Sequence, residues 1–88
     1  MRVDFSNVFE KKYKKTPFPI QLRFEERVQI FKTDKFHPLL NNHALTGQWL
    51  GHRSINITGD WRAIFREFEN GQLLYFDAIG THSELYGK

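Results

Sequence analysis

The spacing of apolar residues divides the chain into a helical first half and an extended second half. Between residues 7 and 32, apolar side chains recur every three or four positions, which is the period of an amphipathic helix. From residue 53 to residue 79, β-branched and aromatic residues dominate and are interrupted by short turn-forming pairs, as in a series of strands. A short alternating segment, residues 2–5, precedes the helical part and predicts an opening strand.

Two helices joined by a proline-rich turn are predicted for the first half. Ser6-Asn7 offers a helix cap, and Glu10 lies three residues beyond Asn7, at the spacing of a capping box. Residues 16–19 end this helix because proline lacks the backbone donor, and Pro19 suits the first residue of a second helix. The second helix is expected to have an apolar stripe made of Ile20, Phe24, Val28 and Phe31. Its charged residues are expected to lie mostly outside this stripe: Arg23, Glu26, Arg27 and Lys32.

The second half predicts three strands and two turns. Asn70-Gly71 lies between two apolar runs, and both residues tolerate the positive φ of a type I′ turn, so residues 61–69 and 72–79 are expected to pair antiparallel. Thr58-Gly59 marks an earlier turn, residues 48–53 are expected to enter the sheet, and residues 36–47 predict an ordered loop. The predicted fold is α+β, a single domain over residues 1–88. A small antiparallel sheet would carry the N-terminal helical hairpin on one face, in the order β-α-α-β-β-β.

Composition narrows the class of protein. The chain has 88 residues, 40% of them hydrophobic, which is enough for one modest core. It has no cysteine, which excludes a disulfide framework and a thiolate zinc site. No stretch is apolar and long enough for a signal peptide or a membrane span, so a soluble cytoplasmic protein is expected. The net charge of +3, with the basic residues concentrated in the first half, favours a polyanion or an acidic protein as partner.

Polar side chains at the ends of the predicted strands are the candidates for chemistry. Asp60 and Arg62 follow the first turn, and His82 and Tyr86 follow the last strand, so a carboxylate, a guanidinium, an imidazole and a phenol are expected near one another. Each also has a purely structural interpretation: Asp60 as a turn residue, Arg62 as part of a solvated strand face, and His82 as part of the final turn. No two of the four histidines have the helical spacing of a zinc motif, so no metal site is expected.

Four motifs fall in an order and at spacings that resemble a known family. They are His43-Ala44-Leu45-Thr46-Gly47, Gly51-His52-Arg53, Asp60-Trp61 and Gly80-Thr81-His82-Ser83-Glu84-Leu85-Tyr86. Together they resemble the RelE/ParE superfamily of toxins from type II toxin–antitoxin systems, and most closely its YafQ-like branch. The resemblance covers residues 42–86 in sequence, and the helical hairpin before them agrees in layout. It implies the RelE-like fold.

The resemblance also implies a function. Such toxins are cytoplasmic, enter the ribosomal A site, cleave mRNA through the RNA's own 2′-hydroxyl without a metal or other cofactor, and are held inactive in an oligomer with a cognate antitoxin. Cleavage of this kind needs a general base, a general acid and positive charge on the phosphorane. Matched position by position, His82 would be the general acid, Asp60 a base or an orienting group, His43 a base or a phosphate ligand, and Arg62 the phosphate-binding cation. The residues expected to contact RNA are Arg53, Asn56, Tyr86, as a stacking aromatic, and Arg66.

Two positions depart from the pattern of the branch. Where the YafQ-like site has an aspartate and a histidine, this chain has Ser54 and Asn56, which form hydrogen bonds but have no useful proton to exchange. Two hypotheses therefore stand side by side. One is a ribosome-dependent mRNA endoribonuclease, and the other is a non-cleaving member that acts by binding, either a gyrase inhibitor of the ParE kind or an antitoxin-binding domain. In both, a groove beside the helices would accept an antitoxin segment.

Overall fold

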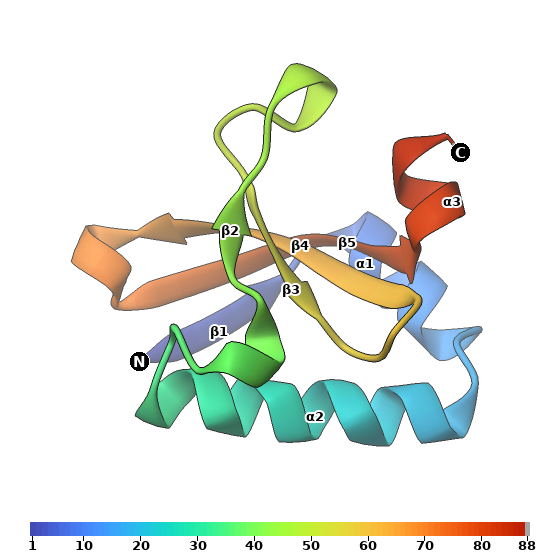
Figure 1. Cartoon of the computed structure of the whole chain (residues 1–88), viewed down its shortest axis with the longest axis horizontal. Coiled ribbons are helices and arrows are strands. Elements are labelled where there is room, and N and C mark those ends of the chain that lie inside the picture. Colours follow the sequence, from blue (N-terminus) through green and yellow to red (C-terminus); the bar gives the residue numbers. More distant parts are fainter. Residues whose placement is uncertain (88) are drawn as a thin grey trace.

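The molecule is built on one five-stranded sheet. Two helices cover one face of the sheet, and a third, short helix follows the last strand (Figure 1). The computed structural model describes residues 1–87. The elements, in chain order, are β1 (Arg2–Phe5), α1 (Asn7–Lys14), α2 (Phe18–Thr33), β2 (His43–Ala44), β3 (Arg53–Asn56), β4 (Trp61–Phe68), β5 (Leu73–Thr81) and α3 (His82–Tyr86). Short 3₁₀ turns occupy Pro38–Leu40 and Gly47–Trp49.

The sheet has the strand order β1-β5-β4-β3-β2. β3, β4 and β5 pair antiparallel, as predicted, and β2, which lies in the predicted loop, pairs antiparallel with β3. β1 runs parallel to β5, with Val3 opposite Leu74. The α+β class is confirmed, but the sheet is mixed rather than wholly antiparallel. Alternation in residues 2–5 predicts a strand without showing its direction, which depends on where α1 and α2 return the chain to the sheet.

The Asn70-Gly71 turn forms as the sequence predicts. Asn70 has φ 57° and ψ 38°, Gly71 has φ 84°, and the Gln72 amide donates to the Glu69 carbonyl at 3.1 Å. These are the angles of a type I′ turn, whose twist matches that of the flanking strands. The turn fixes the register of β4 on β5 from Phe68 opposite Leu73 to Phe65 opposite Phe76, and a one-residue shift follows, so that Ile64 lies opposite Ala78 and Trp61 opposite Thr81.

Both predicted helices form, with differences at their caps and on their buried side. The N-cap of α1 is Ser6, whose Oγ accepts from the Phe9 amide at 3.0 Å, so Glu10 lies one position too far along for the predicted capping box. In α2 the stripe of Phe24, Val28 and Phe31 is buried, but Arg27 is buried as well. Its stem lies in the core, while its Nε donates to the Ile57 carbonyl and its Nη1 to the Leu39 carbonyl, both at 3.2 Å.

The core lies between α1, α2 and one face of the sheet. Aromatic rings meet there edge to face: Phe24 and Phe76 at 5.1 Å between centroids, and Phe31 and Phe65 at 5.4 Å. The predicted loop at residues 36–47 contributes to this core, because its 3₁₀ turn places Leu40 fully inside, and it ends in the two-residue strand β2. The next segment enters the sheet only at Arg53, since residues 47–49 form a turn that precedes β3.

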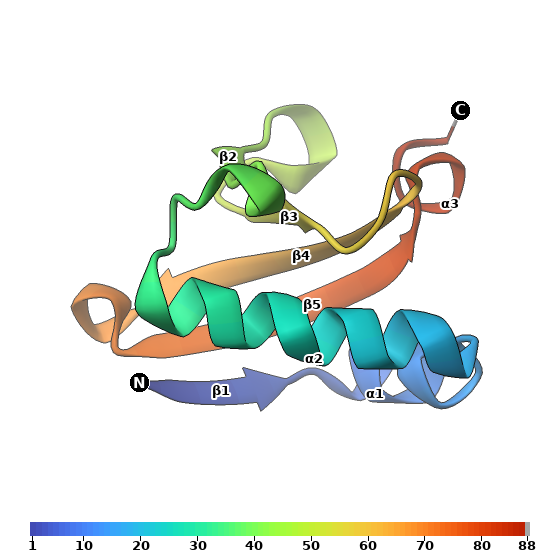
Figure 2. The same ribbon diagram turned by 60° about the horizontal axis from the view of Figure 1, so that its bottom comes forward.

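The other face of the sheet carries fewer covering elements. In Figure 1, α2 runs along one side of the sheet, whereas the connection between β2 and β3 and helix α3 both stand on the opposite side. Turning the molecule brings α2 in front of the strands, with β1 and α1 beside it (Figure 2). No helix among residues 1–87 is long and apolar enough to cross a membrane.

Candidate active site

A polar pocket of about 370 Å³ lies between the β2–β3 side of the molecule and α3. The residues that line it are Asn41, His43, Leu45, Arg62, His82 and Tyr86. Four of the eight side chains proposed from sequence for catalysis or RNA contact are therefore in one place: His43, Arg62, His82 and Tyr86. They come from β2, β4 and α3, which are distant in the chain and are brought together by the antiparallel pairing and by the return of α3.

Arg62 supplies the positive charge of the pocket. It lies on β4 opposite Asn56, and its Nη1 donates to the main-chain carbonyls of Thr58 at 3.0 Å and Trp61 at 3.1 Å. Within residues 1–87 no carboxylate forms an ion pair with it. The guanidinium is thus oriented by neutral acceptors while its charge is not neutralised, which suits the binding of a phosphate.

His43 has a defined proton arrangement. Its Nδ1 lies 2.7 Å from the carbonyl oxygen of Asn41, which accepts hydrogen bonds but cannot donate them. Nδ1 therefore carries the hydrogen, and in the neutral ring Nε2 is the basic nitrogen. Asn41 provides this contact from a left-handed conformation, with φ 46° and ψ 47°. Sequence reasoning missed Asn41, although the Asn41-Asn42 pair was a signal, since Asn is one of the few residues that adopt this conformation readily.

His82 and Tyr86 are held by the local structure of α3. Thr81 caps the helix in a capping box with Glu84: the Glu84 amide donates to the Thr81 hydroxyl at 3.2 Å, and the Thr81 amide donates to the Glu84 carboxylate at 2.8 Å. One turn of helix then brings the two rings to 4.7 Å between centroids, edge to face. The imidazole of His82 is therefore positioned against an aromatic ring, at the mouth of the pocket.

Two further contacts fix the direction in which α3 leaves the sheet. A Cβ on Gly80 would lie 3.0 Å from the Glu84 carboxylate, so the close return of the helix requires glycine there. The Lys12 ammonium of α1 donates to Glu84 at 2.8 Å, and this hydrogen bond, with that from Thr81, holds the pKa of the Glu84 carboxyl below its usual value. Lys12 thus joins α1 to the helix that carries His82.

Asp60 touches the site through its main chain. Its carbonyl accepts from the His82 amide at 2.9 Å, whereas its side chain is exposed and is not among the groups that line the pocket. The turn interpretation also applies to it, because the Thr58 hydroxyl accepts from the Asp60 amide at 3.3 Å. In this geometry Asp60 places the start of α3 through its main chain, and its predicted role in proton transfer stays a prediction.

The other predicted RNA contacts lie outside the pocket. Arg53 donates from Nε to Asn42 at 2.9 Å and lies over the Phe36 ring. Asn56 is on β3 opposite Arg62, but its Oδ1 is buried and has no hydrogen-bond partner in the described part of the chain. The same is true of the Ser54 hydroxyl, two residues earlier on the same face. At the two positions that depart from the family pattern, the chain therefore has buried polar atoms that no other group satisfies.

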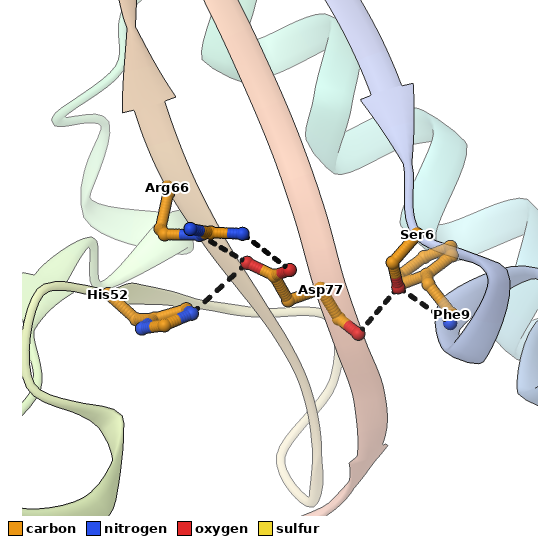
Figure 3. Close-up of polar contacts among 5 residues, drawn as sticks. All are labelled: Ser6, Phe9, His52, Arg66 and Asp77. Carbon is orange, nitrogen blue, oxygen red and sulfur yellow. Dashed lines mark hydrogen bonds and ion pairs between the residues drawn. The ribbon is translucent and has the colours of Figure 1, made fainter.

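Arg66 is bound by Asp77 (Figure 3). Its Nε and Nη2 contact the two carboxylate oxygens at 2.8 and 3.1 Å, and His52 Nε2 approaches the same carboxylate at 3.1 Å. The hydrogen bonds that Arg66 donates to Asp77 raise the pKa of Arg66 above its already high value. Arg66 consequently supports the fold beside the pocket and its charge is neutralised there. Sequence reasoning did not identify Asp77.

A guanidinium, two imidazoles and a phenol around one polar pocket can bind a phosphodiester and exchange protons with the groups on either side of it. The site combines a cation that has no acidic partner with one imidazole whose basic nitrogen is defined. Among residues 1–87, no group of three or more His, Cys, Asp or Glu side chains is placed to hold a metal ion.

Comparisons with known proteins identify a family over almost the whole chain. Residues 1–87 match the model of a family described as "Bacterial toxin of type II toxin-antitoxin system, YafQ". A protein of Escherichia coli strain K12 named "mRNA interferase toxin YafQ" is 30% identical over 67 residues, which cover 76% of this chain and 71% of that protein.

Solved structures share the fold. A YoeB/ParE toxin from Agrobacterium tumefaciens superposes with a TM-score of 0.77 over 93% of this chain and 99% of that one, at 21% identity, which shows the fold alone. The toxin in a structure titled as the Escherichia coli DinJ-YafQ complex gives a TM-score of 0.71 at 26% identity, over 99% of this chain and all of that one.

Proposed function

We propose a function that starts from one established point: the chain belongs to the YafQ family of bacterial toxins of type II toxin–antitoxin systems. The resemblance seen in its motifs is thereby confirmed. Relatives in this family are named mRNA interferase toxins. From membership and from the pocket we infer that this chain is an endoribonuclease that cleaves mRNA on the ribosome and so inhibits translation in the cytoplasm.

The observation that carries the proposal is the composition of the pocket. Arg62 would hold the scissile phosphate, because its guanidinium is pre-oriented by the carbonyls of Thr58 and Trp61 and forms no ion pair with a carboxylate of residues 1–87. Charge developing on the phosphorane would be stabilised by this fixed cation, a contribution that is typically worth about 10²–10³ in rate. Neither a metal nor a cofactor has a role in this proposal.

Proton transfer would be divided between the two histidines. His43 would act as general base through Nε2, since the Asn41 carbonyl keeps the hydrogen on Nδ1. It would take the proton of the RNA 2′-hydroxyl, whose oxygen attacks the adjacent phosphorus. His82 would protonate the 5′-oxygen as the bond from phosphorus to that oxygen breaks, leaving a 2′,3′-cyclic phosphate and a free 5′-hydroxyl. Tyr86, edge to face with His82, would provide a surface for a neighbouring base.

The partner implied by family membership is a cognate antitoxin. A structure of the relative from Escherichia coli is titled as its complex with DinJ, and YoeB toxins have also been solved in complexes with YefM. We infer that this chain assembles with an antitoxin of its own into an inactive oligomer. Such a partner would be acidic, since the chain carries a net charge of +3.

Expression without antitoxin tests the enzymatic proposal. Wild-type protein should arrest growth and produce discrete mRNA cuts, seen by primer extension, whereas His82→Ala and Arg62→Ala should relieve the arrest and remain folded by circular dichroism. Arg23→Ala, which removes the same charge from the exposed side of α2, should stay toxic and serves as the control.

The alternative, a non-cleaving member, is favoured by Ser54 and Asn56, which replace proton-exchanging groups. Intact mRNA on translating ribosomes together with inhibited gyrase supercoiling would establish that alternative and overturn the nuclease.

A further inference from the structure

The connection between β2 and β3, residues 45–52, is attached to the sheet at its end by His52. His52 Nε2 lies 3.1 Å from the Asp77 carboxylate, which Arg66 also holds with two hydrogen bonds (Figure 3). The side chains of His52 and Asp77 are only 19% and 17% exposed. This ion-pair cluster is therefore better shielded from water than an ordinary surface salt bridge.

β5 contains a bulge at Asp77. Ile64 of β4 pairs with Ala78, and the next residue, Phe65, pairs with Phe76, so Asp77 is the extra residue. A bulge shifts the alternation of a strand by one. Phe76 and Ile79 consequently both reach the helix-covered core, and the carboxylate of Asp77 is directed to the opposite side, toward His52.

A second contact joins the same connection to α3. The indole nitrogen of Trp49 donates to the Leu85 carbonyl at 3.1 Å, and the Gln48 side chain approaches the same oxygen at 3.5 Å. The Trp49 ring also meets the His52 ring edge to face, at 5.3 Å between centroids. The two attachments are thus in contact and form a continuous series from Arg66 through Asp77, His52 and Trp49 to the helix that carries His82.

The strand that carries His43 is short and has few contacts of its own. β2 has only two residues, paired with Ser54 and Arg53, and both of its side chains are exposed. The Leu45 amide donates to the His52 carbonyl at 2.9 Å, so movement of His52 is transmitted to the residue next but one after His43. His43 and His82 both line the pocket, His43 from β2 and His82 from α3.

We propose that Trp49 and His52, anchored by the Arg66–Asp77 pair, form a brace that fixes the relative positions of His43 and His82. Neither Trp49 nor His52 lines the pocket, so they are positioning residues and touch no reacting atom. Their effect on cleavage rests on the nuclease function proposed above, whereas their effect on the structure does not. Two imidazoles that transfer protons to and from the groups around one phosphorus must be held in fixed relative positions, because a displacement of about 1 Å costs up to about a hundredfold in rate.

Backbone ¹⁵N relaxation tests the brace without reference to activity. Trp49→Phe removes the indole donor and keeps an aromatic ring, and His52→Leu removes the contact with Asp77. Either change should lower the order parameters of residues 44–50 from about 0.85 toward 0.6 or below, while residues 61–68 stay rigid. His52→Gln, which keeps an N–H donor for Asp77, should restore most of the order. Lys35→Ala, which breaks the exposed pair with Glu67, is the control and should change nothing in residues 44–50.

Steady-state cleavage then tests the consequence. Trp49→Phe and His52→Leu should lower kcat about tenfold or more with KM for the programmed ribosome unchanged within twofold, because alignment is lost while the surface that binds remains. If the order parameters of residues 44–50 are unchanged in both variants, the brace does not exist, whatever the cleavage rate. If these order parameters fall but kcat is unchanged, the brace exists but does not position the two histidines for cleavage. A wild-type protein that fails to cleave would refute the nuclease proposal, and the relaxation measurement would still decide whether the brace exists.

Discussion

The two faces of the sheet differ in how completely their groups are satisfied. The face under α1 and α2 is closed by fully buried apolar side chains such as Phe65, and Arg27, a charged side chain buried among them, has its donors matched by main-chain carbonyls. The opposite face has Arg62 without an acidic partner, and Ser54 and Asn56 with buried oxygen atoms that have no partner in residues 1–87. The comparison teaches that the helix-covered face provides stability, and that the opposite face retains polar groups that the described residues leave unsatisfied.

The largest effect that follows from this comparison is on stability. Phe76→Ala should lower the free energy of unfolding by about 3–5 kcal/mol, because Phe76 is fully buried and packs against Phe9, Phe24 and Phe65. Urea unfolding followed by circular dichroism measures the loss. Tyr75→Ala is the matched variant on the opposite face and should cost about 1 kcal/mol or less, since Tyr75 is partly exposed. Equal losses for the two variants would remove the distinction between the faces.

A smaller effect should come from Asn56→His. Asn56 lies opposite Arg62, and replacing its amide with an imidazole would place a proton-exchanging group beside the phosphate-binding cation. Cleavage on translating ribosomes should become about tenfold faster, which is less than the roughly 10²–10⁴-fold that a fully positioned general acid or base contributes. Ser54→Ala is the control on the same strand, and it should leave stability within about 0.5 kcal/mol because its hydroxyl has no partner to lose. A folded Asn56→His protein with an unchanged cleavage rate would show that the residue at position 56 takes no part in the reaction.

The smallest predicted effect is a pH dependence in α3. The pKa of Glu84 is lowered in the folded chain by Lys12 and Thr81, so the Glu84 carboxylate contributes stability above its unfolded pKa and loses this contribution as the pH falls through the lower, folded value. Wild type should therefore melt slightly above Glu84→Gln at pH 7, and the two should converge below pH of about 4. Lys12→Met should show the same convergence, because it removes the principal cause of the shift. A difference that persists in acid would contradict this assignment.

Much of the fold follows from local chemistry in the sequence. The Asn70-Gly71 turn and the Phe24, Val28 and Phe31 stripe specify one hairpin and one helix face, because each depends on a few neighbouring residues. The direction of β1 and the burial of Arg27 depend on tertiary contacts. Arg27 was predicted to be mostly outside the stripe because it is charged, and it is buried because two carbonyls across the core accept its hydrogen bonds.

The sequence motifs predict which residues come together in the site, because strand pairing fixes the positions of the motifs relative to one another. His43, Arg62, His82 and Tyr86 meet because the strand pairing and the return of α3 bring their motifs together. Strand pairing does not determine which partner an individual side chain contacts. The Asp60 carboxylate is exposed while its carbonyl accepts from the His82 amide, and β5 contains a one-residue bulge that no residue pattern announces.

The central claim is that the pocket cleaves RNA by activating the 2′-hydroxyl next to the phosphate that Arg62 holds. The most direct measurement uses a programmed ribosome carrying mRNA with a single 2′-deoxynucleotide on the 5′ side of the scissile phosphate. The account predicts that this one substitution abolishes cleavage at that phosphate, and that the all-ribose message yields a 2′,3′-cyclic phosphate and a 5′-hydroxyl. Cleavage of the deoxy-substituted message at the wild-type rate would contradict it.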